Sequence, residues 1–349
     1  MNVLCEAPTL LTPRQGIRLH RYRGHDGPWL SVVVPTYRRP DLLQRCLSTL
    51  CDQTMEKWRY EIIVVVDGGS EDIRQLITMM TASPGGPVIQ YLATPARRGP
   101  ASARNLGWRS ARGGIIAFTD DDCIATPTWL ESGWAAIRST GLSGVWGRII
   151  VPIPENPTDH ELCTKGLEQA PCATANCFYR KDALEEVGGF DERFTRAWRE
   201  DSDLQFMLLE RHHRLAPCEG AVIVHPARRA AWGISVALQR NNEFNALLYK
   251  KHPDLYRTLL HASAPWNYYV GVAAMLLALG SLLAHWPAGI VLGMAVWLAL
   301  TAHFCWHRLR VTSKHWAHVC EMVVTSALIP PVAVYWRLKG AWRYRVLFV

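Results

Sequence analysis

The stretch GIIAFTDDD (residues 114–122) joins a short apolar run to three consecutive aspartates. An uninterrupted apolar run that ends in polar residues predicts a buried β-strand. Two earlier runs have the same form: SVVVP (residues 31–35) and EIIVVV (residues 61–66), which precedes Asp67. Helical patterns separate these runs, and this alternation predicts an α/β fold with a mostly parallel sheet and flanking helices.

The same alternation continues on both sides of these three strands. Strands are expected at residues 88–92, 145–151 and 221–224, and helices from Asp41, at residues 99–110, near 129–137 and from Glu200. Ligands of such sheets bind beyond the carboxyl ends of the parallel strands. Asp67 and the three aspartates are therefore expected at a nucleotide site.

The acidic cluster Asp120, Asp121 and Asp122 is the most informative feature of the chain. Adjacent carboxylates repel one another, so burying all three requires a cation. A divalent metal would neutralise them and bridge to a diphosphate. The alternative is a solvated turn after a strand, and the cluster alone does not separate the two.

Other polar residues follow the predicted strands. Asp67 could accept a hydrogen bond from a base or a ribose, or it could be a turn residue before Gly68. Arg97, Arg98 and Arg104 carry guanidinium groups that suit diphosphate oxygens, although Arg104 could also be ordinary surface charge. These residues extend the predicted nucleotide site beyond the aspartates.

The pair Glu200–Asp201 opens a predicted helix. A sugar hydroxyl that attacks an anomeric carbon needs a carboxylate to remove its proton, and a helix-start residue is well held for that task. Acidic residues are also favoured at helix starts by the helix dipole. Both explanations fit the pair taken alone.

Six segments in order resemble the sequential motifs of family 2 glycosyltransferases with a GT-A fold. They are SVVVPTYRRPDLL, EIIVVVDGGSED, GPASARNLG, IIAFTDDDC, GGFDERF and REDSDLQFML, and the resemblance covers roughly residues 30–250. The order of six motifs is more specific than any one of them. The resemblance implies a GT-A, Rossmann-like sheet and an inverting transfer of sugar from a nucleotide-diphosphate sugar to an acceptor hydroxyl.

The resemblance also implies roles for individual residues. Asp201 is expected to be the general base, and Asp120 and Asp122, with His225 as a further candidate, are expected to hold Mg²⁺ or Mn²⁺. Nucleotide-sugar binding is expected of Pro35, Thr36, Tyr37, Asp67, Arg104, Asp120, Asp121, Glu200 and Arg240. Family members often carry a second acid after Asp67, where this chain has Gly68. The Q-x-x-R-W motif of processive synthases is not found, which favours transfer of a single sugar.

Composition predicts a membrane-associated protein. The 349-residue chain has a formal charge of +8, and no Asp, Glu, Lys or Arg occurs in residues 258–307. Because one crossing takes about 20 apolar residues, this run could supply two, at 266–286 and 287–307, or else a buried helical hairpin. A third segment, 322–336, contains Pro330–Pro331 and is expected to lie in the interface or re-enter the membrane rather than span it.

The remaining predictions concern organisation and partners. We expect an N-terminal arm (1–28) without a secretory signal, a catalytic domain (29–257) that faces the cytoplasm at the cell inner or plasma membrane, and a membrane region (258–349). The ten cysteines lack C-x-x-C spacing and are expected to be reduced thiols, and no nucleic-acid motif is found. The acceptor is expected to be lipid-linked or another glycan. The alternatives are a sugar nucleotidyltransferase and a silent nucleotide-sugar-binding scaffold.

Overall fold

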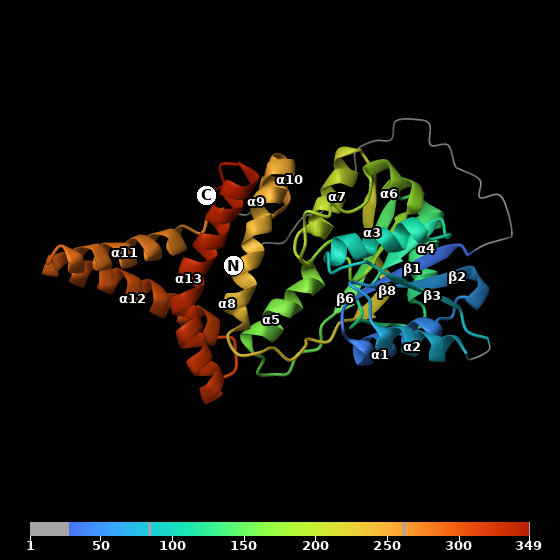
Figure 1. Ribbon diagram of the computed structural model, residues 1–349, viewed down its shortest axis with the longest axis horizontal. Coiled ribbons are helices and arrows are strands. Elements are labelled where there is room, and N and C mark those ends of the chain that lie inside the picture. The colour runs from blue at the N-terminus through green and yellow to red at the C-terminus, as the bar shows by residue number, and fades with distance from the viewer. Residues whose placement is uncertain (1–27, 83–84, 261–262, 349) are drawn as a thin grey trace.

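The computed structural model describes residues 28–82, 85–260 and 263–348, so the predicted N-terminal arm lies almost entirely outside the described residues. An α/β part contains the sheet, and three long C-terminal helices lie to one side of the sheet (Figure 1). Two of them, α11 (Trp266–Leu283) and α12 (Pro287–Leu309), run side by side away from the sheet (Figure 1). The third, α13 (Trp316–Tyr344), packs against helices of the α/β part.

The described residues form one eight-stranded sheet in the order β3-β2-β1-β4-β7-β6-β8-β5. The strands β3, β2, β1 and β4 are parallel to one another, and β7 is antiparallel to both β4 and β6. The strand β8 is parallel to β6 and antiparallel to β5. The predicted α/β sheet is confirmed, and it is mixed: four of its seven strand pairings are parallel and three are antiparallel. The strands are β1 (Leu30–Thr36), β2 (Tyr60–Val66), β3 (Val88–Ala93), β4 (Ile115–Phe118), β5 (Ile124–Ala125), β6 (Gly144–Ile150), β7 (Cys177–Arg180) and β8 (Leu215–Val224).

The apolar strands are buried on both faces, as their uninterrupted hydrophobic runs require. Val32 and Val34 lie in the core cluster that includes residues of α1 (Pro40–Cys51). The intervening Val33 lies in the opposite cluster, with residues of α3 (Pro100–Ser110). Gly107 allows α3 to approach the sheet, because a Cβ there would lie 2.4 Å from Cγ1 of Val33.

The other helices of the α/β part complete its layers. They are α2 (Glu71–Thr81), α4 (Trp129–Thr140), α5 (Asp159–Lys165), α6 (Lys181–Val187), α7 (Glu200–Glu210), α8 (Ile234–Leu238), α9 (Asn242–Lys251) and α10 (Pro253–Leu260). The predicted helix from Glu200 is α7. The predicted boundary between residues 257 and 258 falls inside α10 and stays a prediction.

Three described helices, α11, α12 and α13, are long and apolar enough to cross a membrane. The helix α13 is longer than the predicted segment 322–336 and continues through Pro330 and Pro331. The helix is partly covered by protein, with 39% of its most apolar window buried, compared with 22% for α11 and 17% for α12. A helix packed against neighbours can accommodate proline, because the neighbours help to satisfy the freed carbonyls.

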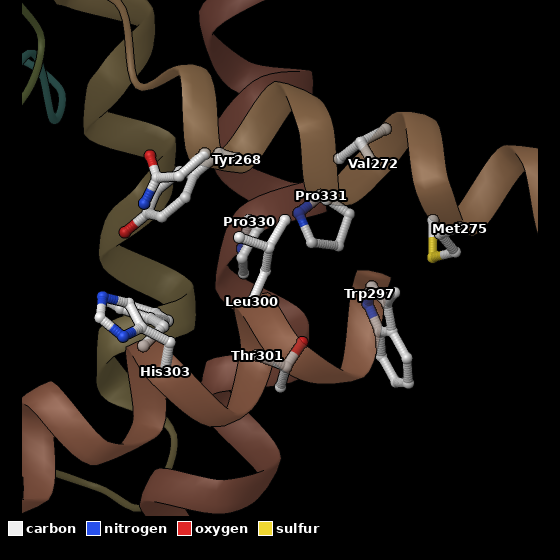
Figure 2. Close-up of a pocket in the computed structure, with 12 residues that line it drawn as sticks. Tyr268, Val272, Met275, Trp297, Leu300, Thr301, His303, Pro330 and Pro331 are labelled. Carbon is white, nitrogen blue, oxygen red and sulfur yellow. The ribbon is translucent and has the colours of Figure 1, made fainter. Parts of the chain in front are cut away.

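A narrow groove separates the three C-terminal helices at this double proline (Figure 2). Pro330 and Pro331 face it from α13, and Tyr268 and His303 lie together at one end (Figure 2). The volume of this groove is about 30 Å³, so the three helices lie close together at the prolines.

Candidate active site

The first aspartate after β4 is held by a buried arginine of α3. Nη2 of Arg104 donates to Oδ1 of Asp120 at 2.8 Å, and Nη1 donates to Oε1 of Glu200 at 2.9 Å. Arg104 is only 2% exposed, whereas the Asp120 side chain is 31% exposed. Burial opposes ionisation of Asp120, but the charge and hydrogen bond of Arg104, with Arg228 nearby, outweigh it and lower the pKa of this carboxyl. Arg104 thus connects the end of β4 to the start of α7.

The predicted base lies at that helix start. Burial raises the pKa of Glu200 to about 7 in spite of Arg104, and burial also raises the pKa of Asp201. The amide and hydroxyl of Ser202 donate to Oδ1 of Asp201 at 2.7 and 3.4 Å. The residue before the helix, Arg199, has a φ of 75°, a conformation that costs a non-glycine residue energy and often marks functional sites. A half-buried carboxylate with a raised pKa is suited to accept a proton.

The second aspartate faces β1. Oδ2 of Asp121 accepts a hydrogen bond of 2.7 Å from the hydroxyl of Thr36, and Nη1 of Arg39 lies 3.3 Å from Oδ1. Burial raises the pKa of Asp121, although these two partners oppose the rise. Asp121 therefore holds the end of β1 and the loop that follows it in place.

The third aspartate meets the predicted histidine. Nε2 of His225 lies 3.4 Å from Oδ1 of Asp122, and Nε of Arg228 lies 2.8 Å from Oδ2. Ligand atoms of Asp122, Cys123 and His225 all lie within 4.8 Å of one another. Burial, with Asp120 and Asp122, raises the pKa of the Cys123 thiol well above its usual value, so the thiolate needed for metal binding is disfavoured.

The donor atoms suited to Mg²⁺ or Mn²⁺ in this group are thus the Asp122 carboxylate and the His225 imidazole. Nδ1 of His225 is buried without a hydrogen-bond partner among the described residues. Asp120 does not belong to the compact group, because its carboxylate is turned to Arg104. The pair Asp122 and His225 fits a divalent ion, and Asp120 precedes Asp122 by two residues.

Asp67 binds the backbone that follows β3. Its oxygens accept hydrogen bonds from the amides of Arg98 and Gly99, each at 2.8 Å, and from the hydroxyl of Thr94 at 2.9 Å. The amide of Asp67 itself donates to the carbonyl of Thr36 at 3.0 Å. Asp67 therefore lies at the same edge as the aspartate cluster and shapes the loop that leads into α3.

A basic cavity of about 630 Å³ lies beside this loop. Arg97, Arg98, Arg196 and Arg240 line it, and Glu192 is its one acidic lining residue. The guanidinium of Arg97 lies 4.4 Å from the ring centroid of Tyr37, the residue after β1. This wall of the cavity is therefore next to the end of β1. Four guanidinium groups around one opening provide a site for an anion such as a diphosphate.

The structure thus gathers the predicted residues at one edge in three connected groups. The first group lies at the end of β1, where Pro35, Thr36 and the following Tyr37 are beside Asp67 and Asp121. In the second group, Arg104 joins Asp120 to Glu200, which precedes Asp201. In the third group, His225 lies beside Asp122. Sequence reasoning missed Arg39, Arg196 and Arg228. Arg228 follows His225 by three residues. A basic residue so close to a candidate metal ligand was the sequence feature from which Arg228 could have been predicted.

A known protein family matches the part of the chain that contains most of this edge. Residues 31–188 match the family model for glycosyl transferase family 2. The chain carries a family 2 glycosyltransferase domain. The matched segment holds Asp67 and the aspartate cluster, whereas Asp201, His225 and Arg240 lie beyond it.

Two curated relatives of this domain are glycosyltransferases. Glycosyltransferase AglE of Haloferax volcanii is 28% identical over 172 residues, which are 47% of this chain and 56% of the relative. Validoxylamine A glucosyltransferase of Streptomyces hygroscopicus subsp. limoneus is 27% identical over 281 residues, which are 67% of this chain and 59% of the relative. The chain therefore spans less than two thirds of the length of either relative.

A solved structure is similar in fold to most of this chain. It is the mannosyltransferase PcManGT from Pyrobaculum calidifontis in complex with GDP-Man and Mn²⁺, with a TM-score of 0.56 and 16% identity over 90% of this chain and 88% of that one. At this identity the similarity establishes the fold, and the predicted GT-A fold is confirmed.

Proposed function

We propose that the chain is an inverting, metal-dependent glycosyltransferase that moves one sugar from a nucleotide-diphosphate sugar to an acceptor hydroxyl. The single observation that carries the proposal is the Arg104 bridge, because it brings the strand-end Asp120 and the helix-start Glu200 to one place. Donor-binding and proton-accepting carboxylates must meet for a sugar to be transferred directly between two substrates. The curated glycosyltransferase relatives support the same reaction class.

The proposed chemical step depends on Asp201. Its carboxylate takes the proton of the acceptor hydroxyl as the oxygen bonds to the anomeric carbon, and the bond from that carbon to the diphosphate breaks. Attack from the side opposite the leaving group inverts the configuration. The raised pKa of Asp201 makes it a better proton acceptor than an exposed aspartate.

The proposed metal ligands are Asp122 and His225, with Asp120 as a further candidate. A bound Mg²⁺ or Mn²⁺ would supply positive charge to stabilise the departing diphosphate. The Mn²⁺ in the complex of the mannosyltransferase with the shared fold supports a divalent ion here. The guanidinium groups of Arg97 and Arg240 would bind the outer phosphate oxygens.

The apolar helices support a membrane-bound acceptor. We propose that α11 and α12 cross the cell inner or plasma membrane, that the family 2 domain faces the cytoplasm, and that the acceptor is a lipid-linked or cell-envelope glycan. Arg308 lies in the last turn of α12 and Arg310 follows it, as the positive-inside tendency favours if the chain returns to the cytoplasm there. Whether α13 spans or lies in the interface stays a prediction.

A thermal-shift screen of nucleotide sugars against the full chain in detergent, with and without Mn²⁺, tests the proposal. One donor should raise the unfolding temperature only when the metal is present, and the Asp122→Ala variant should lose that rise. The Asp201→Asn variant should bind the same donor but release nucleoside diphosphate far more slowly. Unchanged turnover in Asp201→Asn would remove this residue from the reaction.

Product analysis separates the proposal from the nucleotidyltransferase alternative. Release of nucleoside diphosphate supports glycosyl transfer, whereas release of pyrophosphate would show nucleotidyl transfer. Donor binding without either product would leave the chain as a nucleotide-sugar-binding scaffold.

A further inference from the structure

The helix α13 carries an exposed apolar face along most of its length. Its side chains are separated by three, four, seven or eight residues, a spacing that places them on one side of a helix. Their exposed fractions run from 43% for Val324 to 84% for Trp342, so the described residues leave this face uncovered. A contiguous exposed apolar face of this kind marks an interaction surface. It consists of Trp316, Val324, Leu328, Tyr335, Leu338 and Trp342.

The opposite face of α13 is buried against the α/β part. It includes Met322, Ile329 and Gly340, which are all buried. A Cβ at Gly340 would lie 2.5 Å from the carbonyl oxygen of Glu243, so α13 packs directly on α9 there. The helix therefore has one face on the α/β part and one face that is free to meet a partner.

Contacts with the α/β part occur near both ends of α13. Oε1 of Glu321 accepts a hydrogen bond of 2.7 Å from the amide of Gly233, which precedes α8. Nζ of Lys250 in α9 donates to the carbonyl of Tyr344 at 2.7 Å. The helix between these contacts is about 35 Å long, whereas the hydrocarbon core of a bilayer is about 30 Å thick. If α13 crossed a membrane, the two contacts would lie on opposite sides of it, although both come from the polar segment that contains α8 and α9.

The helices α11 and α12 meet α13 on its exposed apolar face. Pro331 falls between Leu328 and Tyr335 in the same helical spacing, and it lines the groove that α13 shares with α11 and α12 (Figure 2). Figure 1 shows α13 running across the ends of these two helices, which extend away from the α/β part. A membrane crossed by α11 and α12 would therefore lie against the exposed face of α13 on both sides of the point where the two helices leave it.

The charges around α13 favour an anionic surface. Residues 308–349 contain seven lysines and arginines and one acidic residue, Glu321. Lys314 and Arg345 are exposed just beyond the two ends of the helix. Bilayers with anionic headgroups attract basic segments of this kind, and tryptophan side chains such as Trp316 and Trp342 favour the boundary between headgroups and acyl chains.

We propose that α13 lies flat in the membrane interface and that its exposed apolar face docks the chain on lipids with anionic headgroups. The inference rests on the proposal that α11 and α12 cross the membrane, and it is independent of the reaction assigned to Asp201. Docking would also bring the basic cavity close to the membrane, because Arg196 lines that cavity and its guanidinium lies 5.7 Å from the ring centroid of Trp336 in α13. A lipid-linked acceptor would then meet the donor at the level of the headgroups.

The test measures the depth of individual side chains with nitroxide spin labels. The full chain, with its accessible cysteines replaced by serine, is labelled at one introduced cysteine at a time and placed in liposomes of phosphatidylcholine and phosphatidylglycerol. Depth follows from the relative relaxation of the label by oxygen and by a water-soluble nickel chelate. Leu279→Cys in α11 is the deep reference, and Met79→Cys in α2 is the reference in water. The docking face is sampled by Val324→Cys, Leu328→Cys, Tyr335→Cys and Leu338→Cys.

The four labels on α13 should lie at nearly the same shallow depth, within about 10 Å of the headgroup boundary. In a helix that spans, the same labels would be spread over about 20 Å of depth, because of the axial rise from Val324 to Leu338. Such a spread would overturn the inference. Relaxation like that at Met79 would also overturn it, as would protection from both reagents, which would indicate a second copy of the chain on this face. A shallow label at Leu279 would refute the proposed membrane crossing instead.

The charge of the headgroups is tested by leaving out phosphatidylglycerol. In phosphatidylcholine alone, the labels at Tyr335 and Leu338 should move towards water. Lys339→Glu should cause the same shift in the mixed bilayer, whereas Arg45→Glu, an exposed position of α1, is the matched control and should leave the depths unchanged. Equal depths in the two bilayers would overturn the choice of anionic lipid as the partner.

Discussion

The Arg104 bridge makes a quantitative prediction for the Arg104→Met variant. Methionine keeps most of the volume but removes both hydrogen bonds, at 2.8 Å to Asp120 and 2.9 Å to Glu200. Removing one partner of a buried ion pair costs about 3–5 kcal/mol, because the remaining charge is left uncompensated. Asp120 is partly exposed, so most of this cost should come from Glu200, which is 3% exposed.

The pH dependence of the variant's stability follows from the pKa of Glu200. Burial raises that pKa to about 7 even with Arg104 present, and removing Arg104 should raise it further. An acid whose folded pKa exceeds its unfolded pKa loses stability as pH rises between the two values. The wild type should therefore lose part of its stability between about pH 4.5 and 7 through this group. In Arg104→Met the loss should continue to higher pH, so the destabilisation should be small at pH 6, where Glu200 is mostly protonated in both proteins, and should grow towards about 3 kcal/mol as pH rises above 7 towards pH 8.

The assay is urea unfolding of the full chain in detergent, followed by tryptophan fluorescence at both pH values. Adding Glu200→Gln to Arg104→Met should recover at least about 1 kcal/mol at pH 8, because the uncompensated charge is gone. Arg109→Met is the matched control on the same helix: its side chain is 52% exposed, so it should cost less than about 1 kcal/mol. The reasoning fails if Arg104→Met costs no more than this control, or if the second substitution recovers nothing.

Three shorter predictions concern neighbouring features. The Ser202 hydroxyl donates to Asp201 at 3.4 Å and so favours the ionised form of that carboxyl. Ser202→Ala removes this contact, so the pKa of the acid limb of the pH–rate profile should rise by about 0.4. A fall in that pKa would contradict the proposed base. Burial lowers the pKa of His252, but hydrogen bonds and attraction from two α7 carboxylates outweigh burial and raise it. The stability due to His252 should thus be complete below about pH 6.5 and be lost as pH rises through the folded pKa, and a His252→Asn variant unfolded in parallel should lack this pH dependence. Gly147→Ala would place a Cβ 2.1 Å from a carbonyl oxygen of β8 and should cost at least about 1–3 kcal/mol in the same unfolding assay, whereas Gly166→Ala, with open space around it, should cost less.

The sheet and its functional edge were predictable because strand ends are local features of the sequence. The runs that became β1, β2 and β4 are apolar and end in polar residues, and parallel neighbours place these ends at one edge. Asp67 and Asp121 consequently meet the end of β1, at Thr36. Only the pattern of each short segment was needed for that conclusion.

The partners of the charged residues were not predictable in the same way. Arg104 and Glu200 are 96 residues apart in the chain, and their contact depends on how α7 packs on α3. The pattern of α3 alone leaves open whether Arg104 faces solvent, a ligand or the core. Sequence reasoning likewise placed Asp120 with the metal, whereas the structure turns its carboxylate to Arg104.

The position of the proposed base also depends on the C-terminal helices. Arg104 holds the first residue of α7, and Nζ of Lys251 in α9 lies 2.6 Å from Oδ1 of Asp203, two residues after the base. The same α9 bears Glu243, which pairs with Arg343 of α13 at 2.6 Å. The helix α7 is therefore held on one side by Arg104 of α3 and on the other by α9, which α13 in turn contacts. The helix α13 is thus part of the scaffold around the proposed base, Asp201.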